Sequence, residues 1–290
     1  MLPLELCRGL EEDLGEKVLE DYPVSGGCIG TSAKLRTESG FCFAKWGDFK
    51  VARTFESERS GLQLLASATS SIRIPEVVTE TRLESGAGIL VLEWIDTSPH
   101  TPESWSALGR GLAEIHRAQE EFYGLPSDNF IGASSQPNDR KSSWGEFFRD
   151  CRLRPQVEMA RRNGVWKLDW DSDFTRLLDR LEQILPENPG ASLVHGDLWA
   201  GNVLTDSKGK PVLIDPAVYY GHREVDIAMS SLFGAFGQPF YDAYEESWPL
   251  DNGFSQRRDV YNLYHLLNHL NLFGSSYASA VGTILQTYGR

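Results

Sequence analysis

The sequence predicts a two-lobed α+β protein, with a small β-rich N-terminal lobe and a larger, mainly helical C-terminal lobe. Three observations support this fold class. The chain has 290 residues, enough for about two domains of roughly 150 residues each. Short strand patterns flank one helix pattern between residues 26 and 94, and amphipathic helix patterns predominate after residue 102. We therefore expect an N-lobe over residues 1–95 and a C-lobe over residues 96–290.

Residue spacing predicts the elements of the N-lobe in turn. Residues 32–37 and 41–46 are expected to form two strands around a turn at Ser39-Gly40. Residues 55–68 have helical spacing, and Glu58 falls on their apolar stripe. Residues 89–94 form a further apolar strand. Because a carboxylate on an inward face needs a charged partner, Glu58 predicts a buried cation nearby.

The C-lobe begins after a polar, proline-bearing junction over residues 96–102. Thr101 is suited to cap a helix that has Pro102 in its first turn, and apolar spacing continues this helix to Gln119. Further amphipathic helices are predicted over residues 174–185, 260–272 and 277–288. Residues 124–141 are predicted to form a long loop, and loops of that length are often functional.

The composition excludes several classes of protein. Hydrophobic residues make up 41% of the chain and charged residues 24%, which excludes a collagen, a coiled-coil rod and a disordered chain. The 28 basic and 41 acidic residues give a net charge of −13, and no basic patch interrupts it, so we expect neither nucleic acid nor a membrane as partner. The four cysteines show no CxxC spacing, and the acidic N-terminus does not suit a signal peptide. We expect a soluble cytoplasmic protein with reduced thiols.

The densest polar motif lies at residues 193–204. It contains His195-x-Asp197 followed by Asn202, and a strand pattern then leads to Asp215. Phosphoryl transfer needs a carboxylate that accepts the proton of the attacking hydroxyl, and oxygen ligands for Mg²⁺. Asp197, Asn202 and Asp215 supply this set in the order and approximate spacing of kinases. The alternative is a structural turn; His195 is expected to brace the loop backbone.

Residues suited to ATP lie upstream. Lys45, near the end of the second hairpin strand, is placed to reach the α- and β-phosphates, with Glu58 as its ion-pair partner. The backbone at Glu93 and Ile95 is expected to contact adenine. A glycine-rich segment before the hairpin is suited to contact the phosphates through backbone N–H groups, although it matches no standard phosphate-loop pattern and an ordinary turn is the alternative. Its residues are Gly26, Gly27, Cys28 and Ile29.

Several longer motifs carry a more specific resemblance. They are residues 26–29, 55–62, 136–138, 195–202, 215–224 and 225–236. Together they resemble the protein-kinase-like superfamily that includes aminoglycoside phosphotransferases and choline kinases, and within it most closely the fructosamine/ketosamine 3-kinase family. Trp199 in the catalytic loop and the DPAVYYGHRE run from Asp215 are more specific than His-x-Asp alone.

The resemblance implies a bilobal protein-kinase-like fold and an activity. The expected reaction is ATP- and Mg²⁺-dependent phosphorylation of the sugar 3-hydroxyl of ketoamines, which are small molecules or glycated lysines on proteins. The 3-phosphate would make the adduct labile and release the amine. The resemblance makes Asp197 the catalytic base, Asn202 and Asp215 the metal ligands, and Lys45 the phosphate-binding residue.

The resemblance also implies roles around the acceptor. Trp199 is expected to stack on the sugar or the attached amine, with a core tryptophan as the alternative. Tyr220, His222 and Glu224 are expected to line or brace the acceptor cleft. Asp226 is expected to hydrogen-bond to the backbone of the catalytic loop rather than to touch the substrate.

Two other functions stay open at this stage. An aminoglycoside or other small-alcohol phosphotransferase of the same superfamily would need a large acidic acceptor pocket. A catalytically inactive nucleotide-binding or scaffold protein would usually have lost one of the catalytic or ATP-binding residues, and this chain keeps all five: Lys45, Glu58, Asp197, Asn202 and Asp215.

Three smaller expectations complete the sequence analysis. Cys28, in the glycine-rich segment, is a hypothetical redox-sensitive thiol, with an inert small residue as the alternative. His265 and His269 have helical metal-ligand spacing, but Leu266 takes the place of the glutamate in a HExxH motif, so we expect ordinary core or surface histidines. The oligomeric state is expected to be a monomer or a dimer.

Overall fold

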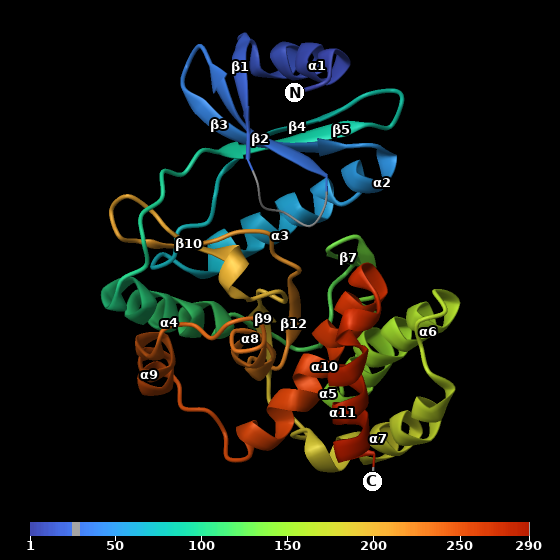
Figure 1. Cartoon of the computed structure of the whole chain (residues 1–290). Coiled ribbons are helices and arrows are strands. Elements are labelled where there is room, and N and C mark those ends of the chain that lie inside the picture. The colour runs from blue at the N-terminus through green and yellow to red at the C-terminus, as the bar shows by residue number, and fades with distance from the viewer. Residues whose placement is uncertain (25–29, 290) are drawn as a thin grey trace.

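A five-stranded antiparallel sheet forms the N-lobe of the computed structural model, which describes residues 1–24 and 30–289 (Figure 1). The strand order is β1-β2-β3-β5-β4. The strands and the three helices packed near them are α1 (Leu4–Leu14), β1 (Val18–Pro23), β2 (Thr31–Thr37), β3 (Phe41–Gly47), α2 (Phe49–Ala52), α3 (Phe55–Ala68), β4 (Val77–Arg82) and β5 (Gly88–Glu93).

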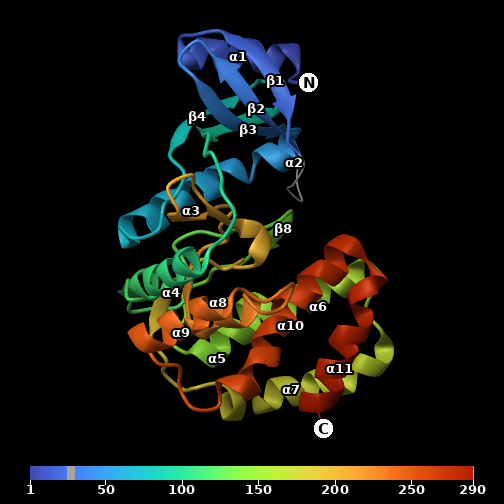
Figure 2. The same cartoon turned by 60° about the vertical axis from the view of Figure 1, so that its left-hand side comes forward.

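The N-lobe sheet is covered on both faces because its interior strand β5, which lies between β3 and β4, is apolar on both. In β5, Ile89 and Val91 pack in the cluster that includes α1, whereas Leu90 and Leu92 pack in the cluster that includes α3. This alternation follows the two-residue period of a strand. Figure 2 shows α1 on the outer side of the sheet and α3 between the sheet and the C-lobe. Helix α3 therefore lies where its side chains can reach both lobes.

The C-lobe is mainly helical, with short strand pairs. Its core contains the helices near the C-terminus, and β9 runs through it between β12 and β6. Its elements are α4 (Pro102–His116), β6 (Gln119–Glu120), β7 (Asn129–Ile131), β8 (Ser134–Gln136), α5 (Trp144–Phe147), η1 (Phe148–Leu153), α6 (Arg154–Arg162), η2 (Leu168–Trp170), α7 (Asp171–Ile184), β9 (Ala191–Val194), η3 (Ala200–Asn202), β10 (Val203–Thr205), β11 (Pro211–Leu213), β12 (Tyr219–Gly221), α8 (Glu224–Met229), α9 (Gln238–Ser247), α10 (Phe254–Phe273), η4 (Ser275–Tyr277) and α11 (Ala278–Tyr288).

The structure confirms several elements predicted from spacing. Strands β2 and β3 form the expected hairpin, in which the Thr37 N–H donates to the Gly40 carbonyl at 2.8 Å. Helix α3 spans residues 55–68 as predicted. Helix α4 begins after Thr101, whose hydroxyl accepts a hydrogen bond from the N–H of Ser104. The predicted lobe boundary at residue 95 falls in the connection between β5 and α4.

Two predicted elements differ. Helix α4 ends at His116, so its expected extension to Gln119 is wrong; Gln119 instead pairs with Ser192 as part of β6, an interaction that local periodicity does not encode. Residues 124–141 are not one irregular loop, because β7 and β8 form a hairpin within them. Gly132, with a φ of 56°, lies at its turn.

The two lobes meet on two sides of α3. At one side, the guanidinium of Arg53 lies 4.7 Å from the centre of the Phe130 ring on β7. At the other, residues 70–73 and 96–98 contact the hairpin of β10 and β11. No helix in the described part of the chain is long and apolar enough to cross a membrane. Cys7, Cys42 and Cys151 are free thiols.

Candidate active site

The catalytic loop follows the buried strand β9, which carries the chain to the face of the C-lobe beneath α3. Asn202 ends the short helix η3 and donates its side-chain amide to the Asp197 backbone carbonyl at 2.8 Å and to the Asp197 carboxylate at 3.0 Å. Asn202 is buried, and Asp197 is half-buried. The Asn202 amide therefore holds the Asp197 carboxylate in a fixed orientation relative to the loop.

Lys45 connects the two lobes at this site. Its Nζ contacts the Glu58 carboxylate on α3 and lies 2.8 Å from Asp215 Oδ1. Asp215 follows β11 and adopts a φ of 51°, a conformation uncommon for a residue other than glycine. The structure thus brings together Lys45, Glu58 and Asp215, whose positions span 170 residues of sequence. The cationic partner predicted for the inward-facing Glu58 is Lys45.

Burial and charge shift the pKa values of these groups in different directions. Burial raises the pKa of Glu58 to about 7, against the opposing effect of Lys45. Burial by itself would lower the pKa of Lys45, but the two carboxylates beside it hold that pKa above its ordinary value. Burial also raises the pKa of Asp197 to about 7, while the hydrogen bond from Asn202 opposes the shift. The lysine therefore stays charged between two carboxyl groups.

Asp226 on α8 holds the backbone of the catalytic loop. Its carboxylate accepts hydrogen bonds from the N–H groups of His195 at 2.7 Å and Gly196 at 2.9 Å, which is the contact expected from the sequence. His116 on α4 lies 3.1 Å from the same carboxylate. Burial by itself would raise the pKa of Asp226, but the hydrogen bond and charge of His116 hold it below its ordinary value. His195 Nε2 lies 3.0 Å from the Ile214 carbonyl, so its ring bridges the loop and the segment before Asp215.

The donor set fits a magnesium ion. The amide nitrogen of Asn202 is bound to Asp197, which leaves its amide oxygen as the donor for a cation. Lys45 binds one oxygen of Asp215, and the side chain of Asp215 is 41% exposed. One amide oxygen and one carboxylate are the hard oxygen ligands that Mg²⁺ prefers, and Mg²⁺ commonly binds few protein ligands because phosphate and water complete its shell.

The residues expected at the acceptor divide into two groups. Trp199 is half-buried in the catalytic loop, and its ring lies against Gly201, where an added Cβ would fall 2.3 Å from the ring. Tyr220 is half-buried on β12. His222 and Glu224 are fully buried. Their burial fits bracing of the cleft, one of the two roles expected, and does not fit direct contact with an acceptor.

The buried pair is held by C-lobe partners. His222 Nδ1 lies 2.7 Å from the Tyr261 hydroxyl, and Arg257 binds both oxygens of Glu224 at 2.6 and 2.7 Å. His222, Glu224 and Asp251 bring ligand atoms within 4.8 Å of one another. Because the Arg257 guanidinium already occupies both oxygens of Glu224, this group is an ion-pair cluster within the lobe.

The two positions expected to contact adenine lie where the N-lobe sheet ends. Glu93 ends β5, and Ile95 is buried in the connection that follows. The side chain of Glu93 is bound to Arg73, a partner that local spacing does not predict. The glycine-rich residues Gly26, Gly27, Cys28 and Ile29 lie outside the described residues, and so does the redox hypothesis for Cys28.

Sequence reasoning missed the polar side chains beneath the catalytic loop. The Gln136 amide donates to the Ala217 carbonyl at 3.1 Å, and Asn129 donates to the Val218 carbonyl at 2.8 Å. The Ala217 N–H in turn donates to the His195 carbonyl at 2.9 Å. The β7–β8 hairpin therefore supports the loop from below. The Gln136-Pro-Asn138 motif was its only sequence signal.

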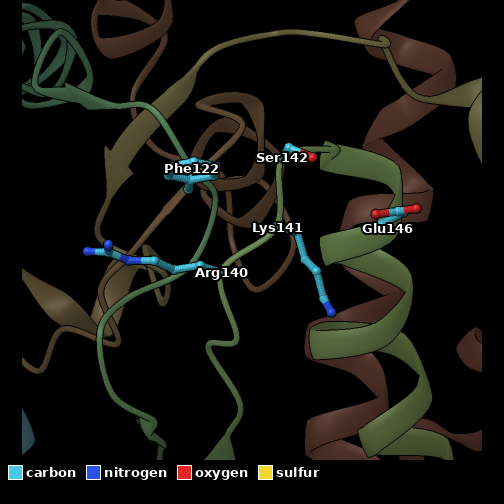
Figure 3. A pocket seen from close by; sticks show the side chains of 5 residues that line it. All are labelled: Phe122, Arg140, Lys141, Ser142 and Glu146. Carbon is cyan, nitrogen blue, oxygen red and sulfur yellow. The ribbon is translucent and has the colours of Figure 1, made fainter.

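A surface pocket of about 340 Å³ lies elsewhere and contains none of the predicted site residues. Figure 3 shows that the side chains of Arg140 and Lys141 extend in different directions, so they do not converge on one anion. The other lining residues are Phe122, Ser142 and Glu146.

His265 and His269 lie on α10, away from this pocket. His265 is buried. His269 binds the His265 carbonyl through Nδ1 at 2.9 Å and packs between Phe233 and Tyr277, as expected for ordinary core histidines.

Together the fold and the site define a kinase of the protein-kinase-like fold. A thermostable aminoglycoside phosphotransferase, solved in a ternary complex with AMP-PNP and hygromycin B, has the same fold, with a TM-score of 0.67 at 16% identity over 98% of each chain. The chain belongs to the fructosamine kinase family, whose family model matches residues 5–289. A putative fructosamine-3-kinase from Haemophilus somnus is similar over 97% of this chain and 96% of its own, with a TM-score of 0.87 at 29% identity.

Curated relatives agree with this assignment. A probable ketoamine kinase from Synechocystis is 38% identical over 272 residues, which cover 93% of this chain and 90% of the relative. A chloroplastic protein-ribulosamine 3-kinase from Oryza sativa is 37% identical over 287 residues, which cover 97% of this chain and 82% of the relative. The similarity therefore extends over both lobes.

Proposed function

We propose that this protein transfers the γ-phosphoryl group of ATP to the 3-hydroxyl of a ketoamine, a fructosamine- or ribulosamine-type glycation adduct, and thereby promotes release of the amine. The observation that carries the proposal is the pairing of Asn202 with Asp197 in the loop after β9, together with the contact of Lys45 with Asp215 between the lobes. These residues supply a proton acceptor, a metal ligand and a phosphate-binding cation. The names of the relatives support the substrate class.

The residues of this chain would divide the work as follows. The Asp197 carboxylate orients the acceptor hydroxyl and accepts its proton as the oxygen attacks phosphorus, and Asn202 holds that carboxylate in place. Lys45, fixed by Glu58, contacts the phosphates of ATP. Mg²⁺, held by Asn202 and Asp215, would neutralise charge on those phosphates when bound. The backbone near Glu93 and Ile95 would contact adenine.

On the acceptor side, Trp199 is the side chain best suited to the sugar. It is half-buried and two residues after Asp197, so a ring stacked on its face would lie near the catalytic carboxylate. Tyr220, half-buried on β12, is the second residue that we propose for the acceptor side. His222 and Glu224 would act from the interior, through their contacts with Tyr261 and Arg257.

A direct assay tests the proposal. Purified protein is incubated with Mg·ATP and a small panel: a fructosamine, a ribulosamine, the parent sugars and an aminoglycoside. We expect ADP release with the ketoamines and not with the parent sugars, and a phosphate at position 3 of the sugar by NMR. Phosphorylation of the aminoglycoside instead would favour the small-alcohol alternative. ATP binding without turnover of any acceptor would favour an inactive nucleotide-binding protein.

Two further properties are part of this proposal. The cysteine composition supports a reducing compartment, and we propose the cytoplasm. Glycated lysines on proteins would be acceptors only if they reach the cleft as extended side chains, so a glycated peptide belongs in the same panel. Gel filtration with light scattering would decide between a monomer and a dimer.

A further inference from the structure

The hairpin of β10 and β11, residues 203–213, is bound to the N-lobe and to the interlobe connection through its backbone. The Arg73 N–H donates to the Pro211 carbonyl at 2.8 Å, and the Leu213 N–H donates to the Arg73 carbonyl at 3.1 Å. The Ser207 N–H donates to the Asp96 carbonyl at 2.8 Å. This hairpin therefore contacts both the segment that follows α3 and the chain that joins the lobes.

The side chain of Arg73 links the end of β5 to the same hairpin. The Arg73 guanidinium binds the Glu93 carboxylate at the end of β5, with Nε 3.3 Å from Oε1, and lies 3.2 Å from Asp206 Oδ2 through Nη1. Arg73 is one third exposed, whereas the side chain of Asp206 is only 5% exposed. A single guanidinium thus joins a carboxylate of the N-lobe to a carboxylate of the C-lobe.

The geometry of Asp206 shows that this contact is fixed on the C-lobe side. Its Oδ1 accepts hydrogen bonds from the N–H groups of Lys208 and Lys210, both at 2.9 Å, so the carboxylate closes the turn. Its Oδ2 faces Arg73. On the other side, Glu93 Oε1 also accepts from the Glu76 N–H at 3.3 Å. Both carboxylates are therefore also held by backbone N–H groups of their own lobe.

The hairpin is directly continuous with the catalytic site. Strand β10 begins immediately after Asn202, and β11 ends two residues before Asp215. The Ile214 N–H donates to the Asn202 carbonyl at 3.1 Å, which joins the two ends of the hairpin. A displacement of the turn relative to the N-lobe would therefore be carried to both residues proposed to hold the metal.

We propose that Arg73 and Asp206 are positioning residues for the nucleotide. Because Arg73 also binds Glu93, their ion pair fixes the end of β5 relative to the hairpin that Asn202 and Asp215 flank. This inference rests on the proposed placement of ATP between the lobes. ATP would be held by both lobes, whereas the acceptor would be held mainly by the C-lobe. Loss of the ion pair should therefore weaken ATP binding selectively.

The test compares Arg73→Ala, Arg73→Lys and Asp206→Asn with a matched control, Arg36→Ala. Arg36 forms an ion pair with Glu20 at 2.7 Å, but this pair joins two neighbouring strands within the N-lobe. We measure KM for ATP, KM for the acceptor and kcat, and separately the Kd of a fluorescent ATP analogue without acceptor. The second measurement does not depend on ketoamine turnover, so failure of the proposed function and failure of this inference are distinguishable.

We expect Arg73→Ala to raise KM for ATP and the Kd of the analogue roughly tenfold, with KM for the acceptor within about twofold of wild type. Arg73→Lys should rescue only part of the loss, because an ammonium lacks the fork that binds two carboxylates. Asp206→Asn should also raise KM for ATP and the Kd of the analogue. The variant that combines Arg73→Ala with Asp206→Asn should bind ATP no more weakly than Arg73→Ala alone. Unchanged ATP binding with a lowered Tm, equal effects on both substrates, or the same effect from Arg36→Ala would overturn the inference.

Discussion

Replacing Asp226 by asparagine should destabilise the protein and impair the catalytic loop, although Asp226 itself touches no substrate. Its carboxylate is 1% exposed and accepts two backbone hydrogen bonds and one from His116. Asparagine is nearly isosteric, but it replaces one acceptor oxygen by an NH₂ group. That group would then face a donor that has no other partner.

The expected magnitude follows from these contacts. A hydrogen bond to a charged group contributes about 1.5–3 kcal/mol, and a buried donor left unpaired costs about 1–3 kcal/mol. Loss of one bond and the burial of one unpaired N–H therefore lower the free energy of unfolding by about 3–5 kcal/mol. Because the affected N–H groups belong to His195 and Gly196, next to Asp197, we expect kcat to fall by roughly a hundredfold even where the variant is folded.

Urea unfolding followed by circular dichroism measures the stability, and steady-state kinetics at low denaturant measures kcat. Asp169→Asn is the matched control, since Asp169 is exposed and the same atom is exchanged; it should change stability by less than about 0.5 kcal/mol. A loss below about 1 kcal/mol for Asp226→Asn, together with normal turnover, would refute the reasoning.

Three further predictions follow from the same structure. Asp197→Asn should abolish turnover while leaving the Kd for an ATP analogue within about threefold; turnover within tenfold of wild type would rule out Asp197 as the base. Gly196→Ala should destabilise the protein by about 3 kcal/mol or more, because a φ of 81° is strained for alanine and the new Cβ would lie 2.1 Å from the Ala217 carbonyl oxygen. The control Gly209→Ala has a similar φ but open space around it, so it should cost only about 1 kcal/mol. Thermal unfolding measures both variants. The free energy of unfolding should also fall as pH drops from 7 to 5, because burial, with His269 and Arg152 nearby and only Asp226 opposing, lowers the pKa of His265 to about 3. Below about pH 6.5 the unfolded chain therefore takes up a proton that the folded chain does not, which lowers the free energy of unfolding by about 2 kcal/mol at pH 5. His265→Gln should remove this loss, and equal pH dependence of the variant and the wild type would contradict the prediction.

The sequence predicted the lobe order, the β2–β3 hairpin and helix α3 because these depend on local periodicity. It also predicted the contact between Lys45 and Glu58, since a carboxylate on an apolar stripe needs a cation. It failed where a contact depends on strands distant in sequence. Gln119 pairs with Ser192, and the β7–β8 hairpin is held by Gln136 against the Ala217 carbonyl, 81 residues away.

The sequence by itself determined the family to which the chain belongs and predicted which residues carry the chemistry, because motif order and spacing can be read without any knowledge of packing. Only the tertiary structure decided which groups support them. His116 reaches Asp226 across 110 residues, Arg73 reaches Asp206 across 133, and His222 and Glu224 turn into the interior. The physical reason is that burial and ion pairing depend on how the elements of both lobes pack, which the periodicity of a single element does not specify.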